Sequence, residues 1–456
     1  MTYSQIGLAS LCESKRNTMN TIQKFTFCLS CLFLSLAVIL SPASASARTF
    51  YVDANTPGSA RQDGNVDTPW KTAQQALQKG AVQAGDTIIF RNGVYGKIFI
   101  KDRRNEKQIT IGAQEGHSAQ FSNIRILSSS NWTIKDLKVN GSLDNDYKKG
   151  TLVTIGRNSE NITLSNLSIE SIADASSWTA EDWHTNSSDG ILSSGKNILI
   201  KTNKLRNVAH GITILGEKTL ITGNIVNQFS ADGMRGLANH LVFEDNVVKN
   251  CLSIDRNHDD GFQSWSFGPN GKVAEGTISD VILRRNTFIN SDRTDGKFAC
   301  KMQGIGMFGG MYENWVIENN LVVVDHWHGI TVMGAKNVKI INNTVYDPNN
   351  VKPGPANIMI LSHRDGTLST DSVIANNIAV SFEKKQLGVL FSNNLALRNA
   401  QSVFRNVDKL DFELAANSPA KQGASATYLP KTDIKGRQRP KNIKGDIGAF
   451  QTPENY

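Results

Sequence analysis

Six polar residues stand before a glycine and an apolar residue at matching places along the chain. They are Asp189, His210, Asp232, Asp260, Gln303 and His328. The first two steps between them are 21 and 22 residues. In a coiled parallel sheet, residues at the same phase of successive coils stand about 4.8 Å apart. Such a column would put carboxylates, imidazoles and an amide on one strip of the surface, where they could transfer protons or hold a cation. Asp-Gly and His-Gly pairs also form turns, so for Asp189 and His210 that role stays open.

Three carboxylates come together around residue 260 if this column forms. Asp259 and Asp260 are adjacent in the chain, and Asp232 lies one coil earlier. Stacked anions repel unless a cation lies between them, and hard oxygen ligands without a Cys/His cage suit Ca²⁺. We therefore expect a calcium site on these three aspartates.

The same region carries cations and aromatic rings. The cationic side chains are Arg235, Arg256, His258 and, a coil or two later, Lys301. Cations beside carboxylates can also form structural salt bridges, and this alternative stays open. Sugar rings stack on aromatic faces, although some tryptophans belong to the core. The tryptophans in question are Trp183, Trp265, Trp315 and Trp327.

A second repeat predicts how these side chains are positioned. A short β-rich run ends in asparagine at Asn166, Asn203, Asn224, Asn246, Asn286, Asn320, Asn343 and Asn377. The steps are 37, 21, 22, 40, 34, 23 and 34 residues, so the shortest cluster at 21–23 and the longer ones contain an inserted loop or nearly two coils. A unit this short cannot bury its own face, and neighbours must stack. We predict an all-β chain: a single right-handed parallel β-helix whose asparagines form a ladder. A propeller or a sandwich would need closely spaced hairpin turns, which the sequence lacks.

The ends of the chain depart from the repeat. Residues 48–100 are expected to form an N-terminal cap and the first coils, residues 101–400 the β-helix, and residues 401–456 a C-terminal capping segment. The run 68–77 predicts a short helix with Pro69 in its first turn, plugging the open N-terminal end.

Residues 1–47 predict a secretory signal peptide. Lys24 precedes an apolar run over 25–40, and small residues follow over 43–47. Met19 is better placed than Met1 to begin it, so residues 1–18 are read as a mis-called start. We expect a secreted protein, extracellular or periplasmic, without a membrane span. Cys12, Cys28 and Cys31 fall in this segment; Cys251 and Cys300 remain, as one disulfide or as two buried free thiols.

Composition limits the class of protein and of partner. The chain has 456 residues, 37 glycines, 11 prolines and a formal net charge of +8. It is too apolar for a disordered protein and too rich in glycine for a helix bundle. The mild positive charge favours an anionic partner. We expect a monomer that binds an acidic polysaccharide and no nucleic acid.

The ends of the mature chain carry a family resemblance. The phrases Phe50-Tyr-Val-Asp, Pro69-Trp-Lys-Thr, Gly85-Asp-Thr-Ile and Gly93-Val-Tyr resemble the first coil of pectate-lyase-like β-helix enzymes. The ending Asp446-Ile-Gly-Ala-Phe is similar to their common tail. The resemblance implies a β-helix enzyme acting on a polysaccharide.

A narrower resemblance concerns the site. Residues 231–233 and 258–261 are similar to the calcium-binding region of polysaccharide lyase family 9. This implies Ca²⁺ on Asp232, Asp259 and Asp260 and a lysine base further along the chain. Lys301 lies at about the right distance in the sequence to be that base. Gln263 stands where that family has a further aspartate. The additional histidines resemble exported β-helix proteins of bacterial exopolysaccharide and biofilm-matrix turnover: His258, His326 and His328.

These features predict β-elimination on a uronate-containing exopolysaccharide. Calcium, helped by Arg235 or Arg256, would neutralise the uronate carboxylate and hold the developing charge. Lys301 or His258 would remove the C5 proton. Arg256 is included in the catalytic set. The substrate-binding set is Arg235, Gln263, Trp265, His328, His210 and Asp189.

Three other functions stay open. A β-helix glycoside hydrolase could use Asp232 with Asp259 or Asp260 as acid and base. A uronan C5-epimerase shares the proton abstraction but forms no double bond. A matrix protein could bind polysaccharide without cleaving it, although it has no reason to gather three aspartates against an acidic polymer.

Overall fold

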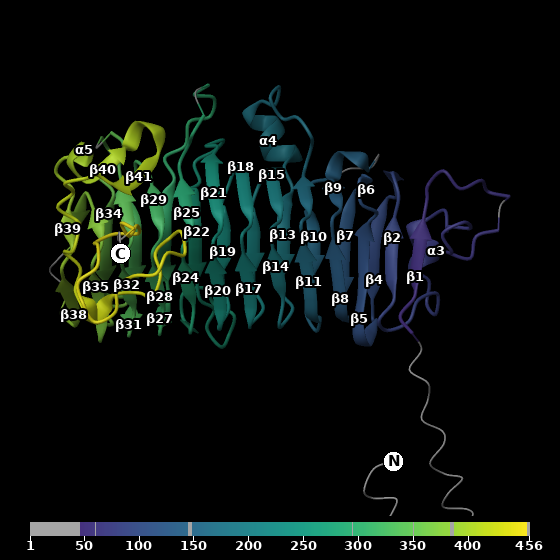
Figure 1. The fold of residues 1–456 in the computed structure, drawn as a ribbon, viewed down its shortest axis with the longest axis horizontal. Coiled ribbons are helices and arrows are strands. Elements are labelled where there is room, and N and C mark those ends of the chain that lie inside the picture. Colours follow the sequence, from purple (N-terminus) through teal and green to yellow (C-terminus); the bar gives the residue numbers. More distant parts are fainter. Residues whose placement is uncertain are drawn as a thin grey trace, which may run out of the picture. The chain divides into compact units, whose positions relative to one another are not determined.

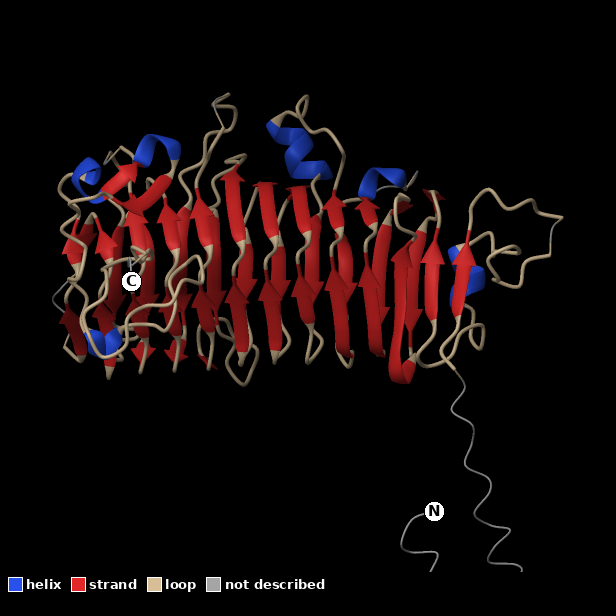
Figure 2. Cartoon of the chain, viewed as in Figure 1, coloured by secondary structure: helices blue, strands red, loops and turns tan. Residues whose placement is uncertain are grey.

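Three long parallel sheets wind around a common core from Ala47 onward (Figure 1, Figure 2). The structure is a computed structural model that describes residues 46–453 except 60, 145–147, 294, 350 and 384–386. The chain divides into the units Met1–Ser46 and Ala47–Tyr456. Of the expected signal peptide, residues 1–45 lie outside the described residues. Among the described residues, no helix is long and apolar enough to cross a membrane.

Each coil passes through sheet A, then sheet B, then sheet C. Sheet A has 13 strands: β1 (Thr49–Val52), β2 (Thr87–Phe90), β5 (Arg104–Ala113), β8 (Ser130–Lys135), β11 (Glu160–Ser165), β14 (Leu199–Lys201), β17 (Thr219–Thr222), β20 (Leu241–Glu244), β24 (Ile282–Arg284), β28 (Val316–Glu318), β32 (Lys339–Ile341), β35 (Ser372–Ala375) and β38 (Val389–Ser392). Sheet B has 12: β3 (Gly93–Val94), β6 (Ala119–Phe121), β9 (Lys138–Asn140), β12 (Ser168–Glu170), β15 (Lys204–Val208), β18 (Ile225–Phe229), β21 (Val247–Cys251), β25 (Thr287–Ile289), β29 (Leu321–Val323), β33 (Thr344–Tyr346), β36 (Ile378–Ala379) and β39 (Leu395–Ala396).

Sheet C carries the predicted column. Its 11 strands are β4 (Lys97–Lys101), β7 (Asn123–Leu127), β10 (Thr151–Ile155), β13 (Asp189–Ser193), β16 (Ile212–Ile214), β19 (Met234–Gly236), β22 (Asp260–Trp265), β26 (Gln303–Gly309), β30 (His328–Met333), β34 (Asn357–Leu361) and β37 (Ser381–Phe382). A smaller sheet holds β23 (Thr277–Ser279), β27 (Met311–Glu313) and β31 (Ala335–Lys336), and an antiparallel pair holds β40 (Phe404–Asn406) and β41 (Asp411–Leu414). The predicted right-handed parallel β-helix is confirmed.

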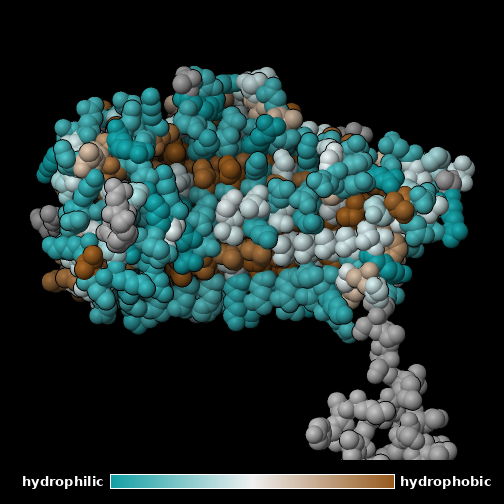
Figure 3. Space-filling model, viewed as in Figure 1, coloured by the Kyte–Doolittle hydropathy of each residue, from teal (hydrophilic) through white to brown (hydrophobic). Residues whose placement is uncertain are grey.

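Alternation along the strands separates core from surface. In sheet C the inward residues stack as Ile191, Ile212, Met234, Phe262, Ile305 and Ile330, each at most 1% exposed. The surface seen in Figure 3 is mainly hydrophilic, with short hydrophobic rows along the solenoid. One continuous apolar interior therefore runs through the coils, and outward side chains are free for chemistry.

The predicted asparagine ladder forms at the turn from sheet A to sheet B. Seven asparagines from Asn203 to Asn377 are buried, and each Nδ2 donates to the Oδ1 of the next asparagine at 2.9–3.0 Å. Asn394 ends the ladder. Asn166 lies outside it, because Leu167 takes the equivalent place and donates its backbone N–H to Asn203 Oδ1 at 2.9 Å. Asn166 instead has φ of 51° and donates its amide to Asp136.

The variant Asn286→Ala tests the ladder. Asn286 Oδ1 accepts from the backbone and amide of Asn246, and its Nδ2 donates to Asn320 Oδ1 and Phe243 O. Removing it leaves buried groups unpaired, so we expect the free energy of unfolding to fall by about 3 kcal/mol. Denaturant unfolding measures this change. Asn349→Ala, at an exposed asparagine, is the control, and an equal loss in both variants would contradict the ladder's role.

The helices are short and lie outside the coils. They are α3 (Ala73–Leu77), α4 (Ala180–Asn186) and α5 (Ala400–Val403), with 3₁₀ turns η1 (Gly141–Leu143), η2 (Val407–Lys409) and η3 (Ala426–Tyr428). The expected N-terminal helix exists but begins later than predicted. Thr72 caps it in a capping box with Gln75, and this leaves Pro69 before the helix, where Trp70 stacks on Phe50. Helix α4, which lies in the insertion before β13, was not predicted.

The C-terminal segment packs against the side of the last coils. Phe404, Phe412 and Phe450 join a cluster with Leu321 and Ile378, which belong to sheet B. The buried Arg439 guanidinium donates to Asn319 Oδ1 at 2.9 Å and to Gly448 O at 2.7 Å. The segment therefore covers sheet B near the C-terminal coils, whereas the sequence led us to expect a cap over the end.

Candidate active site on sheet C

The predicted column of polar residues forms where each coil enters sheet C. The strand register stacks Asp189, His210, Asp232, Asp260, Gln303 and His328 in this order. Two neighbours are in direct contact: His210 Nδ1 lies 2.7 Å from Asp189 Oδ1. Burial acts to raise the pKa of Asp189, but the hydrogen bond and the charge of the His210 imidazole lower it on balance.

The glycine after each column residue is explained by close packing of the coils. A Cβ on Gly211 would lie 2.2 Å from Gly233 O, and one on Gly304 would lie 2.2 Å from Gly329 O. All six of these glycines are described, and none has positive φ. The polar-Gly-apolar motif therefore reflects the narrow spacing between coils. It does not mark left-handed turns at Asp189 or His210.

A cavity of about 420 Å³ opens on sheet C at the C-terminal end of the column. We call it the histidine cavity; it is lined by His258, Asp260, Gln263, Gln303, Phe308, His326, Trp327, His328, Met333 and Arg364. Strands β22, β26 and β30 form its floor. The segment before β30 provides one wall with His326 and Trp327, and the segment after β34 provides Arg364 on the other side.

Asp260 lies at the floor of the histidine cavity as a buried carboxyl group. Its Oδ2 accepts from Gln263 Nε2 at 2.8 Å, while Oδ1 has no hydrogen-bond partner among the described residues. Oδ1 is directed at Gly306, where a Cβ would approach it to 2.5 Å. Burial, together with the charges of Asp232 and Asp259, raises the pKa of Asp260 well above its usual value. The raised pKa favours the protonated, uncharged form of Asp260.

His326 and His328 are uncharged imidazoles that line the same cavity, and Gln303 lies between Asp260 and His328 in the column. Burial lowers the pKa of His326 to about 4, and the charges of His258 and Lys301 lower it further in the same direction. Burial likewise lowers the pKa of His328 to about 4, together with the charges of His326 and His258. The backbone N–H of His328 donates to His326 Nδ1 at 3.1 Å, so the neutral ring of His326 carries its proton on Nε2. His328 Nδ1 lies 2.8 Å from Thr331 Oγ1. When Nδ1–H donates to that oxygen, Nε2 of His328 holds the free lone pair.

Aromatic side chains flank the two imidazoles. Trp327 is 46% exposed, and its ring centroid lies 3.9 Å from that of His328. Phe308 meets His328 edge-on at 4.7 Å. An exposed tryptophan beside proton-transfer groups offers the apolar face of a sugar ring a stacking surface.

The three aspartates predicted to bind calcium do not fit that ion as they stand. Ca²⁺ takes about six to eight oxygen ligands. Asp232 Oδ2 instead accepts from Arg235 Nε at 2.6 Å, and its Oδ1 accepts from the backbone N–H of Asp260 at 3.0 Å. Across the described part of the chain, these three carboxylates do not form a group of ligand atoms within 4.8 Å of one another. For Asp232, the salt-bridge alternative describes the structure.

Cys251 and Cys300 form a disulfide, which decides the alternative that the sequence left open. Asp259 lies against it, with Oδ2 at 3.7 and 3.6 Å from the two sulfur atoms. Burial, and next the charge of Asp232, raise the pKa of Asp259 to about 8. Because the two sulfurs are bonded to each other, this Cys-Asp-Cys group offers a metal no thiolate.

The remaining predicted residues occupy different positions. Arg235 extends over Trp265, with the guanidinium carbon 5.2 Å from the ring centroid. Lys301 is exposed; its Nζ donates to Lys352 O at 2.9 Å, and it does not line the histidine cavity. Arg256 is exposed on the segment before His258. The structure thus brings together Asp260, Gln263, His258 and His328, and leaves Lys301 outside the cavity.

Several cavity residues were absent from the predicted site. The sequence analysis named Trp327 among the tryptophans near the column and His326 among the additional histidines, but it placed neither in the substrate-binding or catalytic set. Phe308 lies on the outward face of β26, in alternation with the buried Ile305 and Met307. Arg364 carries no sequence signal, because it enters from an irregular segment after β34.

No family model and no curated protein matches this sequence. Among solved structures, the chain is similar to pectate lyase Pel9A, at 15% identity over 89% of this chain and 96% of that one, with a TM-score of 0.44. It is similar to the A-module of a mannuronan C-5 epimerase from Azotobacter vinelandii, at 13% identity over 75% and 98% of the two chains, with a TM-score of 0.49. An alginate lyase from Paenibacillus is similar at 13% identity over 75% and 99%, with a TM-score of 0.33. At these identities the likeness concerns the fold alone.

Proposed function

We propose that this protein is an exported lyase that cleaves a uronate-containing acidic exopolysaccharide by β-elimination in the histidine cavity. One observation carries the proposal: His328, whose pKa is lowered, and Asp260, whose pKa is raised, line the same cavity. Titratable groups whose environments move their pKa values in opposite directions are typical of acid–base pairs. A role in biofilm-matrix turnover would follow from the substrate class.

The elimination assigns each group a separate task. His328 Nε2 accepts the C5 proton of the uronate, the bond between C4 and its glycosidic oxygen breaks, and a C4–C5 double bond forms. Asp260 donates a proton to the leaving oxygen. Both groups then regain their starting states by proton exchange with water, so protons and electrons balance.

Cations and rings around the pair support binding of an acidic sugar. Arg364 lines the cavity and is exposed, so its guanidinium can pair with the uronate carboxylate in two parallel hydrogen bonds. Pairing withdraws charge from the carboxylate and makes the C5 proton more acidic. Trp327 offers a stacking face. Lys301 acts through His326, whose pKa it lowers, and is not the base in this proposal.

The rival activities need groups that this cavity supplies less well. An inverting hydrolase needs a second carboxylate to activate water. Asp260 is the only carboxyl group among the residues that line the histidine cavity, and Asp232 is paired with Arg235. A C5-epimerase would use the same base but return a proton to the opposite face of the sugar.

The test is an assay of the protein against a panel of acidic exopolysaccharides. Ultraviolet absorbance from unsaturated uronate ends is the expected result, and it should disappear in His328→Ala. The matched control is His184→Ala, an exposed histidine at the end of α4, which should keep wild-type rates. New reducing ends without absorbance would identify a hydrolase. Changed C5 stereochemistry alone would identify an epimerase, and binding alone a matrix protein.

A chelator tests calcium in the same assay. We expect the rate to stay unchanged, because the Arg235 guanidinium holds the Asp232 carboxylate. Loss of activity that added Ca²⁺ restores would show that Asp232 exchanges Arg235 for the metal, as the family 9 resemblance implies.

The pH dependence of kcat/KM reports the base. His328 acts only when unprotonated, and its pKa is lowered to about 4. Activity should therefore hold from neutral pH down to about pH 5 and fall as the pH approaches 4. An ordinary imidazole would lose activity from about pH 6.5. An acidic limb near 6.5 would exclude His328 as the base and favour the exposed His258.

A further inference from the structure

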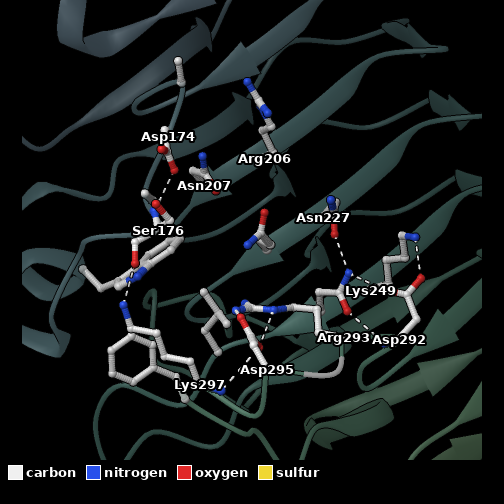
Figure 4. A pocket seen from close by; sticks show the side chains of 17 residues that line it. Asp174, Ser176, Arg206, Asn207, Asn227, Lys249, Asp292, Arg293, Asp295 and Lys297 are labelled. Carbon is white, nitrogen blue, oxygen red and sulfur yellow. Dashed lines mark hydrogen bonds and ion pairs between the residues drawn. The ribbon is translucent and has the colours of Figure 1, made fainter.

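A second cavity, of about 400 Å³, lies at the carboxyl ends of sheet B strands β15, β18 and β21 (Figure 4). We call it the asparagine cavity, after Asn207, Asn227 and Asn250 on these strands. Two insertions enclose it: the segment 173–183, which includes part of α4, and the described residues 292–293 and 295–298 of a second one. Lys297 Nζ donates to Ser176 O at 2.7 Å, so the insertions contact each other beside the cavity. It shares no lining residue with the histidine cavity.

The floor is a rigid set of amide groups. Asn207 and Asn250 are buried, and Asn207 Nδ2 donates to Ile172 O at 2.9 Å. Asn250 Nδ2 donates to Asn227 Oδ1 at 2.7 Å and to Asp292 Oδ1 at 2.8 Å. Groups fixed in this way lose little conformational entropy when a ligand binds.

Three of the four cations that line the asparagine cavity have acidic partners, and the fourth, Lys297, donates to Ser176 O. Lys249 Nζ lies 2.6 Å from Asp292 Oδ2, and Arg293 pairs with Asp295 (Figure 4). Arg206 pairs with Glu170 at 2.6 Å. Neutralised pairs attract an anion weakly, but each pair presents donors and acceptors side by side. A hydroxyl group both donates and accepts, so such a wall suits a ligand with several neighbouring hydroxyl groups.

An apolar wall completes the cavity. Trp183 and Leu252 are buried there, and Phe298 packs against them, partly exposed. Polar groups that converge over a small apolar surface match a sugar, which has hydroxyl edges and an apolar C–H face. Figure 4 shows Asp174 and Ser176 on one side of this space and Lys249 and Asp292 on the other.

We propose that the asparagine cavity is a second saccharide site, which binds an uncharged sugar unit. The histidine cavity, with the Arg364 guanidinium, suits an acidic sugar; the asparagine cavity, where most charges are paired, suits a neutral one. A polysaccharide with both kinds of unit would be held at a place separate from the place of cleavage. The site would raise the affinity for polymer without taking part in the chemistry.

Calorimetric titration of the full protein with neutral sugars tests the site: glucose, galactose, mannose, rhamnose, cellobiose and lactose. We expect saturable binding of at least one of them. The double variant Arg293→Ala/Asp295→Ala should weaken that binding at least tenfold. The matched control is Arg405→Ala/Asp411→Ala, which removes another exposed ion pair, on β40 and β41. It should bind as the wild type does.

The variant His328→Ala separates this proposal from the proposed lyase. It should bind the neutral sugar with unchanged affinity, whether or not the protein cleaves an acidic polymer. No saturable binding of any of the six sugars would overturn the proposal. Equal affinity in Arg293→Ala/Asp295→Ala and wild type would also overturn it, as would loss of binding in His328→Ala.

Discussion

Replacing Asp260 by asparagine is expected to lower kcat/KM for polysaccharide cleavage by about 10²- to 10⁴-fold, the contribution of one general acid. Asparagine has nearly the same shape and can still accept a hydrogen bond from Gln263 Nε2. Its amide cannot give up a proton to a leaving oxygen. The fold should therefore survive while the reaction stops, and initial rates together with thermal unfolding measure the two effects.

Asp259→Asn is the matched control for this variant. Asp259 is adjacent, buried and has a raised pKa, but its carboxyl group contacts the disulfide and does not line the histidine cavity. We expect its rate to stay within a few-fold of the wild type. A large loss of rate in Asp259→Asn with a small loss in Asp260→Asn would show that Asp259, and not Asp260, is the acid. This result would reject the proposed mechanism.

Removing the disulfide should have the largest effect on stability. The bond joins residues 49 positions apart, and closing a loop of that length in the unfolded chain is worth about 4 kcal/mol. The variant Cys251→Ser/Cys300→Ser should lose about that much free energy of unfolding in urea. It should also lose activity, because the disulfide connects two coils that carry cavity residues. Between these coils the Gln303 N–H donates to Asp259 O at 2.9 Å.

Reductant provides the control for the disulfide. Wild type unfolded and refolded with a dithiol should match the double serine variant, and the variant itself should not respond. If wild type and variant unfold at the same denaturant concentration, the two sulfurs are not joined in the native protein. Thiol titration of the unfolded, unreduced wild type gives an independent count.

The fold could be predicted because each coil repeats the same sequence pattern. Asn203, Asn224 and Asn246 occur one coil apart, and the backbone spacing of parallel strands turns this period into a ladder. The column on sheet C followed from the same period. Asn166 was misassigned because it is one residue out of phase: sequence alone does not distinguish a buried asparagine from an exposed one in the left-handed conformation of the same turn.

The site was predicted less completely, for two physical reasons. The repeat period predicts which residues are neighbours along the column, but it does not predict the direction of a long side chain. Asp232 was therefore assigned to calcium, whereas the Arg235 side chain, three residues later, binds its carboxylate. Irregular insertions have no period, so the sequence could neither predict that Arg364 lines the cavity nor exclude Lys301 from it. Their positions depend on packing between segments far apart in the chain.

Gly306 has no side chain, so the surface of sheet C is recessed at this position. Gln263 and Thr331 flank it on the neighbouring strands and both carry side chains there. An alanine would meet Asp260 Oδ1 at 2.5 Å and Phe308 at 2.3 Å, so even a methyl group would displace the acid or the ring. The space over Asp260 is thus set by a missing atom. If the proposed lyase activity holds, substitutions at this position should alter which polymer is accepted.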